Sequence, residues 1–103
     1  FKTKKSLKLN AMSSNLDSIE MKEFLEQINF ALSLEFKEKW RHRFSTHFVS
    51  IFQSRILKAL KEEKPVKKDS LVSLYTKKHK YNLSEVLCFF DEIDITLYSP
   101  LIY

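Results

Sequence analysis

The absence of glycine is the feature that most constrains the fold of this chain. None of its 103 residues is glycine, and only two are proline. Tight turns with positive φ, β-hairpins and phosphate-binding loops usually need glycine, because a Cβ atom clashes there. The sequence therefore argues against hairpins, Rossmann-type folds and Walker-type loops, and it favours helices joined by polar loops. The length suits one domain with one modest core.

Cysteine use and hydropathy limit the class of protein further. Cys88 is the only cysteine, so an internal disulfide is excluded. Because Leu87 and Phe89 flank it, we expect Cys88 to be a buried, unreactive thiol. No run of 18 apolar residues and no signal-peptide core is present. Since the chain opens at Phe1 and not at methionine, we expect a piece of a larger protein.

The first expected helix begins at Asp17 or Ser18 and reaches the region of Trp40. Asp17 and Glu20 have the spacing of a capping box, and acids suit the positive end of a helix. Apolar residues recur at helical spacing through this segment. They are Met21, Phe24, Leu25, Ile28, Ala31, Leu32 and Phe36.

A polar segment over residues 41–46 separates the first apolar stripe from the next. Ser45 or Thr46 could cap a second helix there. That helix is expected to run to Lys64, because Pro65 is a normal stop. One long helix through residue 64, with no break at Ser45, is the alternative, and both readings stay open.

Two shorter helices are expected in the last third of the chain. The third begins at Asp69 or Ser70. The fourth begins at Asn82, which forms a capping-box pair with Glu85, and Pro100 ends it. Three β-branched residues make a strand the main alternative here: Val86, Ile93 and Ile95. We therefore predict an all-α fold, a single small bundle of about four helices.

The predicted domain occupies residues 16–103, and residues 1–15 are interpreted as a basic linker of the juxtamembrane type. Lysines accumulate on the cytoplasmic side of membrane spans and bind anionic lipid surfaces. An ordinary basic linker is the competing interpretation. The lysines expected to contact a membrane surface are Lys2, Lys4, Lys5 and Lys8.

Charge alternates in blocks along the chain, which has a net charge of +5. Residues 36–80 contain thirteen Lys and Arg against four Asp and Glu, whereas residues 9–35 and 81–103 are acidic. Such blocks indicate helices that complement each other's charge, or separate basic and acidic docking faces.

No motif for catalysis or metal binding is present, so we expect a non-enzymatic domain without a cofactor or a metal. His42 and His47 are five residues apart and fall on different helix faces, and His79 is distant. Neither HExxH nor CxxC occurs. Three nearby acids are interpreted as a solvated face and not as an acid–base pair. They are Asp91, Glu92 and Asp94.

The most distinctive segment, residues 36–44, alternates basic and aromatic residues. Aromatic residues recur every four positions from Phe36 to Phe52, and each step drifts about 40° around a helix. One end of an unbroken stripe should therefore leave the core, and Trp40, flanked by cations, is the better candidate. A protein hot spot, a base-stacking surface and a plain core stripe all use such residues. The predicted partner-binding residues are Phe36, Lys39, Trp40, Arg41, Arg43 and Phe44.

The C-terminal stretch, residues 87–100, resembles the end of the cytoplasmic tail domain of BatD-type proteins of the bacterial aerotolerance operon. Three residues fall on that family's pattern: Asp94, Tyr98 and Pro100. Residues 24–32 are similar to the family's first tail helix, and residues 69–75 to its short third element.

The resemblance implies a non-catalytic interaction domain at the cytoplasmic face of the inner membrane, within a larger membrane-anchored protein. The implied partners are proteins with von Willebrand A domains or a MoxR-type ATPase, and the implied role is stress tolerance. A free-standing, basic helical module that binds nucleic acid is the alternative from a different class.

Overall fold

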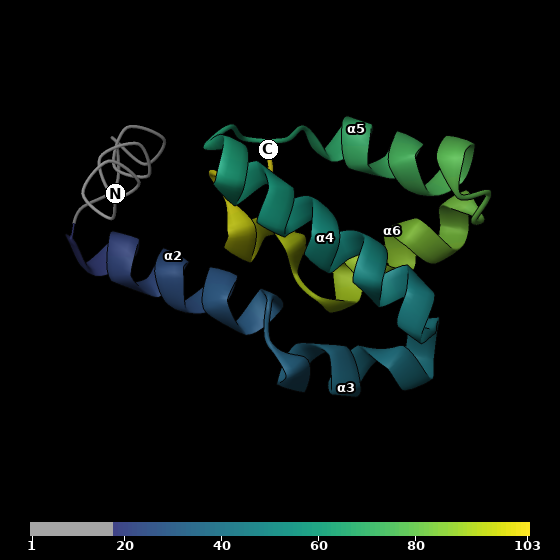
Figure 1. Cartoon of the computed structure of the whole chain (residues 1–103), viewed down its shortest axis with the longest axis horizontal. Coiled ribbons are helices and arrows are strands. Elements are labelled where there is room, and N and C mark those ends of the chain that lie inside the picture. The colour runs from purple at the N-terminus through teal and green to yellow at the C-terminus, as the bar shows by residue number, and fades with distance from the viewer. Residues whose placement is uncertain (1–17) are drawn as a thin grey trace.

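The computed structural model describes residues 18–103, which form five α-helices, one π-helix and one 3-10 helix. They are α2 (Ser18–Ala31), α3 (Leu34–Phe44), α4 (Thr46–Glu62), α5 (Lys68–Ser73), the π-helix η1 (Leu74–Lys78), α6 (Leu83–Glu92) and the 3-10 helix η2 (Ile95–Tyr98). The all-α prediction is confirmed, with five helices in place of about four (Figure 1). Asp17 and the predicted linker, with its four lysines, lie outside the described residues.

The additional helix arises because the chain breaks at Ser33, inside the segment expected to be one helix up to Trp40. The Ser33 hydroxyl donates to the carbonyl of Phe30 at 2.6 Å and accepts from the amide of Phe36 at 3.1 Å. One side chain thus closes α2 and caps α3. The spacing of apolar residues did not indicate this break. Phe36 follows Leu32 by four residues, so it continues the apolar pattern of α2 although it belongs to α3.

The second break falls at Ser45, so the alternative of one long helix through residue 64 is wrong. Ser45 has a φ of 96°, which a helix cannot continue through. Its hydroxyl accepts from the Phe48 amide at 3.2 Å and caps α4. The drift of aromatic residues therefore restarts at Ser45, and a single long stripe does not form.

The last two predicted helices also differ from the observed elements in their boundaries. The third begins at Lys68, and the fourth is interrupted after Glu92, because Asp94 takes a left-handed conformation with a φ of 53°. Asn82 stands at the N-cap of α6, but its side chain makes no capping hydrogen bond. Within residues 18–103 the competing strand is absent, and only an isolated bridge joins Val66 to Ile102.

The core is built around α4, which lies across the middle of the molecule with α3 on one side and α5 on the other (Figure 1). Phe89 of α6 packs edge-on against Phe44, Phe48 and Phe52, with ring centroids 4.9 to 5.4 Å apart. Such edge-to-face pairs add to the stability gained from burial. The aromatic stripe predicted from sequence is thus mainly core.

The C-terminal residues fasten the segment between α4 and α5. The Val66 amide donates to the carbonyl of Leu101 at 2.8 Å, and the Tyr103 amide donates to the carbonyl of Val66 at 3.0 Å. Leu101 and Ile102 are buried. These bonds hold the segment that precedes α5 against the C-terminal residues of the chain.

Candidate binding groove

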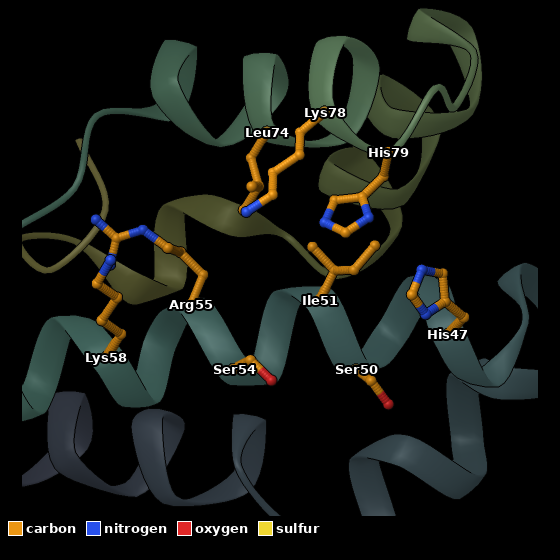
Figure 2. Close-up of a pocket in the computed structure, with 9 residues that line it drawn as sticks. All are labelled: His47, Ser50, Ile51, Ser54, Arg55, Lys58, Leu74, Lys78 and His79. Atoms are coloured by element: carbon orange, nitrogen blue, oxygen red, sulfur yellow. The ribbon is translucent and has the colours of Figure 1, made fainter.

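A groove of about 350 Å³ separates α4 from η1 and the residue that follows it. We call it the basic groove, because cations and histidines line it and no carboxylate does (Figure 2). Its lining residues are His47, Ser50, Ile51, Ser54, Arg55 and Lys58 from α4, and Leu74, Lys78 and His79 opposite.

Helical spacing places one wall of the basic groove. His47, Ile51 and Arg55 are four residues apart on α4, so they follow one another along one helix face. Ile51 is 7% exposed and forms an apolar floor together with half-buried Leu74. The groove therefore has an apolar middle between polar ends.

The opposite wall depends on the π-helix η1. The His79 amide donates to the carbonyl of Leu74, five residues earlier, at 3.2 Å. Single π turns recur at functional sites, where they change the direction of side chains relative to an α-helix. Here the turn lines the groove with Leu74, Lys78 and His79.

Tyr75 attaches this wall to α4. Its ring is fully buried and stacks on Phe48, with centroids 4.3 Å apart. Its hydroxyl donates to the carbonyl of Phe48 at 2.7 Å. Burial raises the pKa of Tyr75 well above its usual range, so the hydroxyl stays protonated and keeps donating. The separation between η1 and α4 is thereby fixed.

The cations of the basic groove lack acidic partners within the described residues, and Arg55 is the most buried of them. Its Nη1 atom is buried and has no hydrogen-bond partner among residues 18–103. A buried donor without an acceptor costs about 1–3 kcal/mol. Lys58 and Lys78 line the same groove, and neither forms an ion pair within the described part of the chain. An anion entering the groove would meet three unpaired cations.

The two histidines mark the other end of the groove. The ring centroids of His47 and His79 are 5.4 Å apart, and Tyr81 lies 6.1 Å from His47. Figure 2 shows the histidine rings at one end, Arg55 and Lys58 at the other, and Lys78 between them. No group of three metal-ligating side chains occurs within residues 18–103.

The predicted partner-binding residues of α3 are divided by the fold. Phe36 and Phe44 are 0% and 4% exposed, so they are core residues and a partner cannot reach them directly. Trp40 is half-buried, packs edge-on against Phe89, and carries the Lys39 ammonium 5.1 Å from its ring centroid. Only the cations and the rim of Trp40 remain at the surface.

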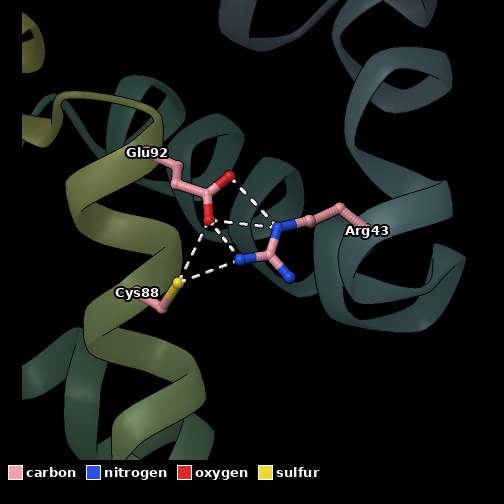
Figure 3. A network of polar contacts seen from close by, with 3 residues as sticks. All are labelled: Arg43, Cys88 and Glu92. Carbon is pink, nitrogen blue, oxygen red and sulfur yellow. Dashed lines mark hydrogen bonds and ion pairs between the residues drawn. The ribbon is translucent and has the colours of Figure 1, made fainter.

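Two of the α3 cations already have anionic partners. Arg41 pairs with Glu38 at 3.0 Å. Arg43 reaches across to α6 and donates to both carboxylate oxygens of Glu92, with Nε 3.2 and 3.0 Å from them (Figure 3). The segment around Trp40 therefore has less unpaired charge than the basic groove.

The same network corrects the expectation that Cys88 is buried among apolar side chains. Cys88 is half-buried, Leu87 beside it is 51% exposed, and the Cys88 Sγ atom donates to Glu92 Oε2 at 3.1 Å. Arg43 Nη2 lies 3.3 Å from the same sulfur.

The electrostatics of this network keep the thiol protonated. The hydrogen bond to Glu92, followed by desolvation, raises the pKa of Cys88 above its usual value. The Glu92 carboxyl has a lowered pKa, first because Arg43 and then because Cys88 donate to it. A protonated thiol is a poor nucleophile, so the geometry fits a structural contact.

The sequence did not point to the residues of the basic groove, because they come from two segments that meet only when η1 packs on α4. A usable signal was nevertheless present. His47, Arg55 and Lys58 fall at helical spacing along the segment that was expected to form the second helix. A basic run over residues 77–80 then offers the second wall.

Comparisons with protein-family models, with curated proteins and with solved structures find no match for this chain. Among the described helices, none combines the length and apolarity needed to cross a bilayer.

Proposed function

We propose that this chain is a non-catalytic protein-interaction domain that binds an acidic segment of a partner protein in the basic groove. The observation that carries the proposal is that Arg55, Lys58 and Lys78 line a groove without a carboxylate and form no ion pair within residues 18–103. A carboxylate matches the planar fork of a guanidinium, and charge-assisted hydrogen bonds are the strong ones.

The distribution of charge favours this surface over the segment around Trp40. Arg41 and Arg43 are paired with Glu38 and Glu92, whereas Arg55 and Lys58 have no ion pair with any residue from 18 to 103. Unpaired cations steer an acidic partner to the site and speed its association.

The groove lacks the arrangement that nucleophilic catalysis needs. Ser50 and Ser54 line it, but neither hydroxyl bonds to His47 or His79 within the described residues. Figure 2 shows both hydroxyls directed away from the wall that carries His79. A serine nucleophile requires an adjacent base within hydrogen-bond reach, so binding accounts for these residues better than catalysis does.

The test is fluorescence anisotropy of a labelled ten-residue peptide rich in glutamate. Replacing Arg55 and Lys58 together by Gln should weaken its binding by about 2–3 kcal/mol, because charge-assisted hydrogen bonds are lost. The matched control is Lys61→Gln with Lys64→Gln, two exposed lysines outside the groove lining. Equal losses in both double variants would mean that only net charge matters.

Nucleic-acid binding is the second candidate function, favoured by the thirteen cations within residues 36–80 and by the paired histidine rings. Single strands bind to grooves that combine cations with aromatic stacking platforms. The half-buried Trp40, however, does not line the basic groove. Tighter binding of a labelled oligonucleotide than of the acidic peptide, at equal salt, would favour this alternative.

The cellular setting is part of the same proposal. The resemblance of residues 87–100 to BatD-type tails supports a membrane-anchored bacterial protein with this domain on the cytoplasmic face. The acidic segment would then belong to a protein with a von Willebrand A domain or to a MoxR-type ATPase. Co-purification of such a protein with the full-length chain, and its loss in the Arg55 and Lys58 double variant, would test this assignment.

A further inference from the structure

We infer that the basic groove selects an extended peptide with an acid-x-apolar-x-acid pattern, in which x is any residue. The inference rests on the proposed function and adds the conformation and spacing of the ligand. It follows from the order of side chains along α4, where a polar end, an apolar middle and a cationic end succeed one another.

The spacing of these three positions is set by the helix. His47, Ile51 and Arg55 are separated by four residues each, and an α-helix rises about 1.5 Å per residue. The polar, apolar and cationic positions therefore lie about 6 Å apart, and the outer two about 12 Å apart.

An extended peptide has a closely similar repeat. Its residues rise about 3.3 Å each, and alternate side chains point to the same side. Residues i, i+2 and i+4 thus present three side chains about 6.6 Å apart along one face. Over the whole contact the peptide and the helix differ by only about 1 Å, which side-chain flexibility absorbs.

Each position in the groove offers a matching environment. At one end, the imidazoles of His47 and His79 can donate to a carboxylate. In the middle, Ile51 and Leu74 form an apolar floor. At the other end, Arg55 and Lys58 supply two cations that form no ion pair within residues 18–103.

The experiment compares two peptides of identical composition by isothermal titration calorimetry. The first, Ser-Asp-Ala-Leu-Ala-Asp-Ser, places both acids and the leucine on one side of an extended chain. The second, Ser-Asp-Leu-Ala-Ala-Asp-Ser, keeps the spacing of the acids but turns the leucine to the opposite side. We expect the first to bind about tenfold more tightly, because only its leucine is buried on Ile51 and Leu74.

A variant of the protein gives an independent check. Arg55→Gln should lower the affinity for the first peptide about tenfold. Lys61→Gln, on the same helix but outside the groove, should leave this affinity unchanged. Both variants alter exposed or half-exposed side chains and not core residues.

The outcomes separate the two proposals. Equal affinities for the two peptides, with sensitivity to Arg55→Gln, would overturn the extended pattern and leave the proposed function standing. Binding of neither peptide at millimolar concentration would overturn both. Binding that Arg55→Gln does not change would place the peptide elsewhere on the surface and would also overturn both.

Discussion

Two arginines with the same chemistry have opposite surroundings in this fold. Arg43 is held by both oxygens of Glu92, whereas the Nη1 atom of Arg55 has no acceptor within the described chain. Because a guanidinium remains charged at every physiological pH, only its partners decide whether it is available to a ligand. The candidate site therefore lies where cations lack an ion pair, and not simply where cations are most numerous.

The first prediction concerns the reactivity of Cys88. Replacing Glu92 by Gln removes the charged acceptor that holds the thiol proton, so the pKa of Cys88 falls and its thiolate fraction rises at any given pH. Labelling by a thiol reagent should become severalfold faster at neutral pH, and the rate profile should shift to lower pH.

Asp91→Asn is the matched control, because the charge of Asp91 raises the pKa of Cys88 less than any of the other causes does. It should change the labelling rate far less than Glu92→Gln. Equal acceleration by the two substitutions would show that general negative charge, and not the hydrogen bond, protects the thiol.

The second prediction concerns Tyr75. Tyr75→Phe removes the hydroxyl that donates to the Phe48 carbonyl but keeps the buried ring, so the free energy of unfolding should fall by about 1 kcal/mol. Chemical denaturation of the variant measures this loss. Tyr81→Phe is the control, since the Tyr81 hydroxyl makes no hydrogen bond within residues 18–103. A comparable loss in Tyr81→Phe would contradict the role given to the Tyr75 bond.

Residue environments were the hardest feature to predict from the sequence. The neighbours of Cys88 in the chain indicated burial, but its surroundings are set by Arg43, which is 45 positions away. Phe36 and Phe44 were assigned to a docking surface because they alternate with cations, yet both are core residues. Only tertiary packing decides which side of an amphipathic segment is covered.

At the scale of elements, the lack of glycine has a visible consequence. Among residues 18–103, four take positive φ without being glycine: Ser45, Glu63, Lys80 and Asp94. Each lies at or near the end of a helix, where glycine is the usual residue. A residue with a Cβ atom in the left-handed region costs about 1 kcal/mol. Replacing such a residue by glycine should therefore stabilise the protein.

The third prediction tests this at Lys80, which is exposed and has a φ of 64°. Lys80→Gly should raise the free energy of unfolding by about 1 kcal/mol, because glycine adopts this conformation without a steric penalty. Lys80→Ala removes the same charge but keeps the Cβ atom, so it should give no such gain. A gain in the alanine variant would assign the effect to charge and not to backbone conformation.

Helix breaks could be predicted only where polarity interrupts the apolar pattern. Ser45 follows a run of polar residues, so the sequence predicts a break there as one of two alternatives. Ser33 was not recognised, because apolar residues continue at helical spacing on both sides of it. The end of α6 could not be predicted for the same reason, since Ile93 and Leu97 extend the apolar pattern beyond Glu92.

At the scale of the whole molecule, charge is arranged by element. Cations of α4 and η1 meet at the basic groove, while the acids Asp91 and Asp94 lie at the end of α6 and beyond it. The block pattern could be read from the sequence, but the groove could not, because it exists only where η1 packs on α4. The all-α class followed from periodicity and from the absence of glycine.

The fourth prediction concerns Lys2, Lys4, Lys5 and Lys8, which lie outside the described residues. If they contact a membrane surface, the chain should bind anionic vesicles weakly, at roughly 1 kcal/mol per lysine, and added salt should release it. Vesicle co-sedimentation of a variant with all four replaced by Gln measures the contribution. Unchanged binding would remove the support for a juxtamembrane segment.

The fifth prediction, and the most direct test of the central claim, is a map of where an acidic peptide contacts the protein. Two-dimensional amide NMR of the labelled domain, titrated with the glutamate-rich peptide, reports every backbone position at once. We expect the largest shifts at His47, Ser54, Arg55, Lys78 and His79, and none of that size around Trp40. The largest shifts around Lys39, Trp40 and Arg41, with the basic groove unchanged, would contradict the account.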